Sequence, residues 1–197
     1  MPRDLGQRAG LTRAAVLAEA GRIASEEGLA SLTIRTLANN LDVAPNAVYG
    51  WVDSKAALLD ALVDEALCGV VPGAEHADHP VPATQEGIRE FLLTVFDAMM
   101  TRPELAPLFL SRAASPGPNA TAIRRVTTGL LIDSGLPNDR ALQAVPVLLV
   151  QVMGFAVLLS TTHGSQLVAQ PTSAPPRNLV AEGVGWLVAG IMGELDG

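Results

Sequence analysis

Apolar residues recur every three or four positions along most of the chain, and this spacing is typical of helices that bury one face. Near the N-terminus it predicts a first helix over residues 12–27, with Thr12 as its N-cap and a stop at Gly28. A second helix begins near Thr33. No alternation of apolar and polar residues lasts long enough to predict a strand. The pattern therefore predicts an all-α fold.

A short third helix closely follows the second. The turn between them contains Asp42, and Asp tolerates the left-handed backbone conformation that such turns can require. Pro45 suits the first turn of the third helix, which we expect to end around Val52. Two short helices joined in this way form a helix-turn-helix, whose second helix can enter the major groove of DNA. The residues expected to hold the two helices together are Leu37, Ala38, Leu41, Val43, Val48 and Val52.

A fourth helix, capped by Ser54, runs toward Val70, and a connector rich in proline follows. Beyond the connector the same periodicity predicts helices near residues 84–101, 104–113, 119–134, 138–162 and 177–195. We therefore divide the chain into a helix-turn-helix domain (1–53), a connecting helix (54–71) and a helical bundle (72–197).

The apolar run over residues 141–160 is long enough to raise the alternative of a membrane span. Gln143, Pro146 and Gln151 interrupt it, and no cluster of Lys or Arg flanks it. We favour a buried helix, because the core of a bundle or dimer needs a helix that is apolar on all sides. The partners we expect therefore include no membrane.

The absence of a visible secretory signal and the presence of a single cysteine, Cys68, favour the reducing cytoplasm. Cys68 lies in an apolar run, so we expect a buried, structural thiol. The net charge of −7 is unusual for a protein that binds nucleic acid. However, residues 1–60 carry six basic and seven acidic side chains, so the excess of acid lies in the remainder. This distribution permits a DNA-binding N-terminus but does not by itself predict one.

Residues 32–62 resemble the signature of the TetR family of bacterial transcriptional repressors. The family pattern is L-T-x-x-x-L-A-x-x-L-G-V, then a short helix with a tyrosine, then a lysine near the start of helix four. The residues that match in order and spacing are Leu32, Thr33, Leu37, Ala38, Leu41, Val43, Tyr49, Lys55 and Leu58. The resemblance implies an N-terminal three-helix DNA-binding domain followed by a helical ligand-binding and dimerisation domain. It also implies a homodimer that binds a palindromic DNA operator and responds to a small-molecule effector.

The chain departs from the family pattern at three positions. Asp42 stands where the family usually has Gly, and Ala44 replaces a common capping Ser or Thr. Losing such a cap typically costs about 1 kcal/mol. Gly50 replaces a larger residue, which costs a similar amount, about 1 kcal/mol relative to Ala.

Carried over position by position, the resemblance implies DNA contacts. Asn46 can pair with an adenine edge, and Tyr49 can reach a phosphate or stack on a sugar. The ammonium of Lys55 and the first N–H groups of the fourth helix would converge on a phosphate. Trp51 stands where the family often places His or another aromatic residue, and it either contacts DNA or only packs. The full set is Thr33, Arg35, Pro45, Asn46, Ala47, Tyr49, Trp51 and Lys55. Arg3, Arg8 and Arg13 are either a tail or an arm that touches DNA.

The C-terminal helices are expected to supply the dimer interface and the effector pocket. Pairing through residues 138–162 and 177–195 would set the two recognition helices one DNA turn apart, about 34–36 Å. A ligand would then change this separation by shifting helix four. The expected interface residues are Leu142, Val145, Leu149, Met153, Leu187 and Ile191. The expected pocket, suited to a small apolar effector, comprises Phe91, Phe96, Met99, Met100, Phe109, Arg112, Gln151, Phe155 and His163.

Two other classes of function stay open as alternatives. An enzyme built on a helical bundle would need convergent carboxylates or His on facing helices, and the sequence shows no such pattern. A protein-binding adaptor would use residues 44–59. The segment EHADH, residues 75–79, offers metal-ligand types, but we interpret it as a solvated loop. We therefore expect no enzyme activity, no cofactor and no metal.

Overall fold

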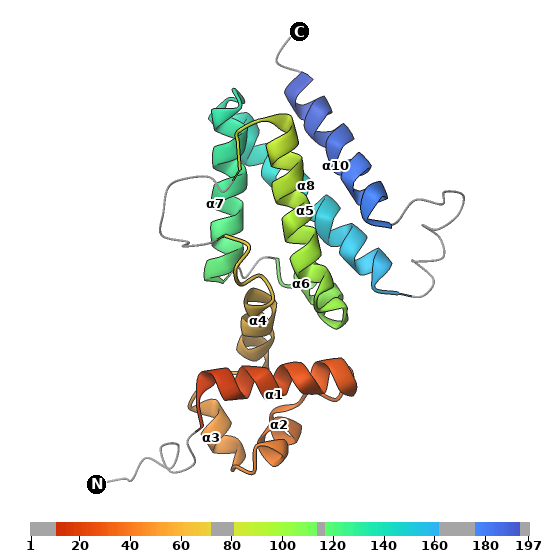
Figure 1. Cartoon of the computed structure of the whole chain (residues 1–197). Helices are drawn as coiled ribbons and strands as arrows, with labels where there is room; N and C mark the ends of the chain where they lie inside the picture. The colour runs from red at the N-terminus through yellow and green to blue at the C-terminus, as the bar shows by residue number, and fades with distance from the viewer. Residues whose placement is uncertain (1–10, 72–80, 114–116, 162–175, 194–197) are drawn as a thin grey trace. The chain divides into compact units, whose positions relative to one another are not determined.

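The structure, a computed structural model, describes residues 11–71, 81–113, 117–161 and 176–193, and these ranges contain helices and no strand. The predicted all-α fold is confirmed (Figure 1). The chain divides into two compact units, Met1–Glu65 and Ala66–Gly197. The division therefore falls after the fourth helix, which groups with the first unit.

The first unit contains α1 (Arg13–Glu26), α2 (Ile34–Asn40), α3 (Pro45–Tyr49) and α4 (Lys55–Glu65). The helix α1 packs on α2 and α4, and α2 packs on α3. Thr12 caps α1 as predicted, since its hydroxyl accepts a hydrogen bond from the Ala15 N–H at 3.1 Å. The buried apolar side chains of α1 to α3 include Val16, Leu17, Ala20, Ile23, Leu37, Ala38 and Val48.

The fourth helix is shorter than predicted. It ends at Glu65, and a turn follows that contains Gly69 with a φ of 83°. Leu67 and Val70 are buried on either side of this turn, whereas Cys68 is exposed. The prediction of a buried Cys68 is therefore wrong. The thiol does not lie on the inner face of a helix but on a turn, and the turn buries the neighbouring Leu67 and Val70 instead.

The second unit contains α5 (Gln85–Met100), η2 (Pro103–Leu105), α6 (Ala106–Ser111), α7 (Pro118–Asp133), α8 (Asn138–Leu159) and α10 (Pro176–Gly193). These bounds agree with the predicted helices to within a few residues, except that the single helix predicted near residues 104–113 is two elements, η2 and α6. The helix α8 packs on α5, α6, α7 and α10, and α10 also packs on α5 (Figure 1). Thus α8 is central to this unit.

Among the described helices, α8 is long and apolar enough to cross a membrane by length and composition alone. Its buried face, which packs within the unit, consists of Ala141, Ala144, Val145, Leu148, Leu149, Val152 and Ala156. Elsewhere on the helix, Leu142 is 58% exposed and Val147 and Val150 are each 51% exposed. The expectation of a buried helix therefore holds for one face only, and a second apolar face lies on the surface.

Candidate nucleic-acid interface and the second helical unit

The recognition-helix candidate α3 is anchored by few side chains. Val48 is fully buried and Val52 nearly so, whereas Asn46 is exposed and Tyr49 is 49% exposed. The N-cap Ala44 makes no side-chain hydrogen bond, as its side chain predicts. The outward side of α3 is thus polar and aromatic, as helical spacing predicts. Of the other expected contacts on this helix, Pro45 is exposed and Ala47 is half-buried.

The turn that precedes α3 has the left-handed residue that the sequence predicts. Asp42 has a φ of 53° and is the only non-glycine residue with positive φ in the described ranges. The next N–H, that of Val43, donates to the Ala38 carbonyl at 3.0 Å, which closes the end of α2. Asp42 therefore occupies the position where a glycine ordinarily ends a helix.

Two expected contacts lie at the start of α2. The Thr33 hydroxyl accepts a hydrogen bond from the Thr36 N–H at 3.0 Å and lies 2.8 Å from the Thr36 hydroxyl. Thr33 is therefore the N-cap of α2, and its exposed side chain is oriented by this role. Arg35, in the first turn of α2, is exposed.

The basic side chains of this unit differ in what they contact. Arg22 pairs with Glu19 at 2.7 Å and also with Glu26. Its hydrogen bond lowers the pKa of Glu19 below the ordinary value. In contrast, Arg35 and Lys55 are exposed and make no ion pair with any residue in the described ranges. These two cations are free to meet a phosphate group.

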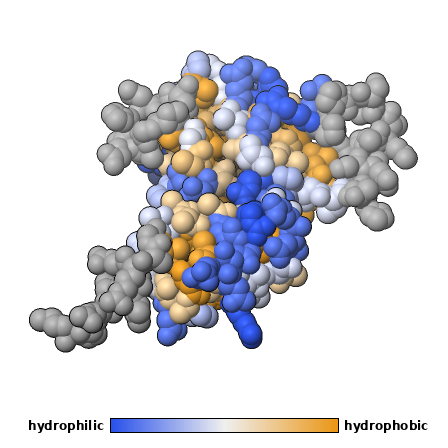
Figure 2. Space-filling view, turned by 60° about the horizontal axis from the view of Figure 1, so that its bottom comes forward, coloured by the Kyte–Doolittle hydropathy of each residue, from blue (hydrophilic) through white to orange (hydrophobic). Residues whose placement is uncertain are grey.

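Lys55 is the first residue of α4, directly after its N-cap. The Ser54 hydroxyl accepts a hydrogen bond from the Ala57 N–H at 3.0 Å, which confirms the predicted cap. Trp51 follows α3 and leaves 39% of its surface exposed. Figure 2 brings forward the side drawn at the bottom of Figure 1, and a band of hydrophilic residues lies there beside hydrophobic patches. The candidate interface is therefore defined by individual exposed side chains, of which Arg35 and Lys55 are cations.

The expected effector residues fall into two groups in the second unit. Of the expected residues, four on α5 and α6 are buried in the core of this unit: Phe91, Phe96, Met99 and Phe109. Met100 and Arg112 are half-buried near them in sequence. Gln151 and Phe155 lie apart, on α8. His163 and the segment 75–79 lie outside the described residues, as do Arg3 and Arg8.

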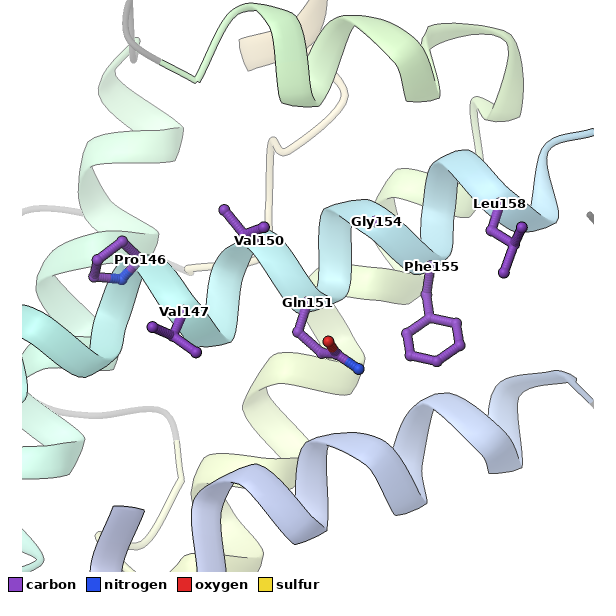
Figure 3. A pocket seen from close by; sticks show the side chains of 7 residues that line it. All are labelled: Pro146, Val147, Val150, Gln151, Gly154, Phe155 and Leu158. Carbon is purple, nitrogen blue, oxygen red and sulfur yellow. The ribbon is translucent and has the colours of Figure 1, made fainter. Parts of the chain in front are cut away.

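An open hollow of about 730 Å³ follows one side of α8 (Figure 3). All of its lining residues belong to that helix: Pro146, Val147, Val150, Gln151, Gly154, Phe155 and Leu158. In Figure 3 the side chains of Gln151 and Phe155 point toward α10. Among the described residues, no group of three or more His, Cys, Asp or Glu side chains is placed to hold a metal ion.

The expected dimer residues differ in their exposure. Leu142 is exposed, and Met153, Leu187 and Ile191 are half-buried. Val145 and Leu149 are buried, so they present little surface to a second chain. Trp186 of α10, which is not among the residues predicted from sequence, is 70% exposed. The spacing of apolar residues predicts this exposure. The buried side of α10 has an apolar residue at every fourth position, and Trp186 does not fall on that side; these residues are Val180, Val184, Val188 and Met192.

Comparison with known proteins bears on both units. No protein-family model matches the chain. It is 31% identical over 173 residues to the class D tetracycline repressor protein of Escherichia coli, with 86% of this chain and 75% of the repressor covered. A possible TetR family transcriptional regulator from Streptomyces coelicolor A3(2) has a similar fold, with a TM-score of 0.76 and 21% identity over 92% of this chain and 99% of that chain.

The structure of BioQ with its natural double-stranded DNA operator is also similar. The TM-score is 0.71 and the identity is 26%, over 92% of this chain and 98% of BioQ. The identity to the tetracycline repressor extends far beyond the helix-turn-helix, through most of both chains. The chain therefore belongs to the TetR family of transcriptional regulators.

Proposed function

We propose that the protein is a repressor that binds a palindromic operator as a homodimer and leaves it when a small apolar effector binds. The observation that carries this proposal is the exposed polar and aromatic side of α3, flanked by the unpaired cations of Arg35 and Lys55. The similarity to BioQ, whose structure holds its DNA operator, supports the same function.

On the DNA side, we propose separate roles for base and phosphate contacts. Asn46 and Ala47 would meet base edges in the major groove, since an Asn amide can pair with adenine and a small residue permits close approach. Arg35, Tyr49 and Lys55 would contact the phosphates, and such contacts fix orientation and supply most of the affinity. Thr33, Pro45 and Trp51 complete the proposed surface.

We propose that the dimer forms through the exposed sides of α8 and α10. This revises the residues expected from sequence. Leu142, Met153, Leu187 and Ile191 remain in the proposed interface, and Val147, Val150 and Trp186 replace the buried Val145 and Leu149. Val147 of α8 and Trp186, Leu187 and Ile191 of α10 border one open hollow, and exposed apolar side chains that gather in this way mark an interaction site in a soluble protein.

We propose that the effector binds within the second unit among the aromatic and methionine side chains of α5 and α6. This revises the set expected from sequence, because Gln151 and Phe155 line the open hollow on α8 and His163 lies outside the described residues. Phe91, Phe96, Met99, Met100 and Phe109 give this region an apolar character, and Arg112 supplies a polar anchor. A coupling of about 1–3 kcal/mol between effector and operator would change the operator affinity 5- to 150-fold. This mechanism needs no catalytic step and no cofactor, and it would act in the bacterial cytoplasm.

The proposal is tested by fluorescence anisotropy with labelled duplex DNA that spans the promoter of the protein's own gene. We expect Y49A, R35A and K55A to weaken binding. The slope of log affinity against log salt should fall by about 1 for each phosphate contact that R35A or K55A removes. R22A is the matched control, because Arg22 is already paired with glutamates, and its slope should equal that of the wild type.

The competing functions predict other results. Full affinity in a Y49A/K55A double variant would remove the DNA-contact assignment. A protein that binds neither this DNA nor a pool of random duplexes would instead favour an adaptor or an enzyme. The effector proposal is tested separately by thermal shift across a library of small apolar compounds, and it fails if no compound both raises the melting temperature and releases DNA.

A further inference from the structure

The hollow along α8 contains one polar side chain. Pro146, Val147, Gly154 and Phe155 are among its apolar lining residues, and Gln151 interrupts them near the middle of the strip. Within the described part of the chain, no hydrogen bond joins the Gln151 side-chain amide to another residue. An apolar strip with one unsatisfied amide is therefore exposed on the surface of the second unit.

The Gln151 amide packs against α10. Gly183 of α10 lies directly against it, since a Cβ at this glycine would come within 3.2 Å of Gln151 Nε2 and 3.6 Å of the Phe155 ring. Figure 3 shows both side chains extending from α8 toward α10. The absence of a side chain at Gly183 thus lets the amide lie at the seam between the two helices.

The amide restricts what can cover the strip. A primary amide has two N–H donors and a carbonyl acceptor. An apolar partner would bury these groups without hydrogen bonds, and a buried polar group without a partner destabilises the complex. The partner must therefore be apolar along the strip and must offer both a donor and an acceptor at one point.

A second copy of the same strip has this property. Closed dimers are two-fold symmetric, so a residue on the axis faces its own counterpart. We propose that Gln151 lies at the two-fold axis of the dimer, where its amide and that of the partner's Gln151 donate to and accept from each other. This inference rests on the dimer in the proposed function and adds the register in which the two chains pair.

The rest of the strip fits this register. With the axis at Gln151, a residue four places before it faces the residue four places after it on the other copy of α8. Val147 of one chain then meets the partner's Phe155, so a small side chain packs against a large one. A single polar pair in an apolar helix interface is also a known way of specifying register. Gln151 would therefore select one alignment among the many that an apolar strip allows.

A charge-exchange experiment tests the pairing. In sedimentation equilibrium, Q151E and Q151K should each dimerise about 10-fold more weakly than the wild type, or weaker still, because like charges meet at the axis. An equimolar mixture of the two should regain the wild-type dimer, because each Glu then meets a Lys. Gln143, exposed two turns earlier on α8, is the matched control. Its counterpart in this register is residue 159, so mixing Q143E with Q143K should restore nothing.

A second measurement does not depend on charge. In a C68S background, which removes the only native cysteine, Q151C should form an interchain disulfide when copper phenanthroline oxidises the two thiols. The corresponding Q143C variant should not. Circular dichroism first confirms that each variant is folded, and its disulfide formation is measured afterwards.

The possible outcomes separate this inference from the proposed function. If the wild type is a monomer at micromolar concentration, the dimer itself is wrong and both proposals fall. If the wild type is a dimer and the Gln151 variants pair as it does, only the Gln151 assignment is overturned. The Gln151 assignment is also overturned if Q151E and Q151K weaken the dimer, their mixture does not restore it and Q151C forms no disulfide.

Discussion

Glu19 of α1 and Asn40 of α2 are joined by a hydrogen bond of 2.9 Å, donated by the Asn40 amide to the Glu19 carboxylate. The same carboxylate accepts a hydrogen bond from Arg22 at 2.7 Å. Asn40 is the last residue of α2, two residues before the left-handed Asp42. The carboxylate therefore ties α1 to the point where the chain turns toward α3.

We expect E19Q to lower the free energy of unfolding slightly at pH 7, because it weakens the charged hydrogen bond to Arg22 on the protein surface. The interaction with Arg22 lowers the folded-state pKa of Glu19 below its ordinary value of 4.5. Its stabilisation is thus present above the unfolded-state pKa and disappears as the pH falls through the lower folded-state pKa. Urea unfolding of the wild type and E19Q should therefore give different stabilities at pH 7 and converging ones as the pH falls well below 4.5. A difference that persists unchanged in acid would contradict this role.

The second prediction concerns the turn at Asp42. Left-handed backbone costs an ordinary residue about 1–2 kcal/mol, whereas Gly adopts it freely and Asn tolerates it well. We expect D42A to lower the melting temperature, and D42N to leave it nearly unchanged. D42N also removes a negative charge next to the proposed DNA surface, so its operator affinity should rise above that of the wild type.

D42G separates the two effects further. It should equal or exceed the stability of the wild type while it also gains affinity for DNA. Thermal melting followed by anisotropy with the same operator DNA checks all three variants. Equal stabilities for D42A and D42G would show that the φ of 53° at this turn imposes no measurable strain.

The sequence alone predicts much of the first unit, because its signals are local. Thr12 and Ser54 act as caps through their own hydroxyl groups, and Asp42 adopts the turn conformation that its side chain permits. The helix-turn-helix is therefore recognisable from residue type and spacing. Cys68 shows where local reasoning fails, since an apolar neighbourhood in sequence did not reveal that α4 ends at Glu65.

The second unit is less predictable from sequence because α8 is apolar on nearly all sides. Periodicity then does not distinguish Val145, which is buried, from Val147, which is exposed. Only the packing of α5, α6, α7 and α10 around one side of α8 decides which face remains outside. The predicted interface residues are therefore divided between the core and the surface.

The third prediction concerns the start of α5. The Gly87 N–H donates to the Thr84 hydroxyl at 3.1 Å, and a Cβ at Gly87 would lie 2.0 Å from the Pro82 carbonyl oxygen. Because that neighbour is backbone, G87A must displace the chain, and we expect a loss of about 1–3 kcal/mol of stability. Gly185 of α10 is the matched control, since its nearest neighbour would be the Arg89 Cδ at 3.6 Å, an ordinary contact. G185A should be neutral or should stabilise the helix by up to about 1 kcal/mol.

Chemical denaturation of both variants measures this difference directly. If G87A is as stable as G185A, the close approach of Pro82 to α5 does not constrain the helix start.

The final prediction uses the two tryptophans, Trp51 and Trp186, which are the only ones in the chain. They lie in different units, and we propose different partners for them: DNA for Trp51 and a second chain for Trp186. In a W51F variant the remaining emission comes from Trp186, which is 70% exposed in the isolated chain. Dimerisation would bury this indole, so dilution from micromolar to nanomolar concentration should shift its emission to longer wavelength as dimers dissociate.

In a W186F variant the emission of Trp51 should not respond to dilution but should change when operator DNA is added. Because a buried Trp is commonly among the strongest contacts of an interface, W186A should weaken the dimer by 2 kcal/mol or more, about 30-fold. Operator affinity should then fall as well, since each chain alone reaches only one half-site. Sedimentation over the same concentration range shows whether the dimer dissociates. If it does and the emission of Trp186 stays constant, Trp186 does not lie in the dimer interface.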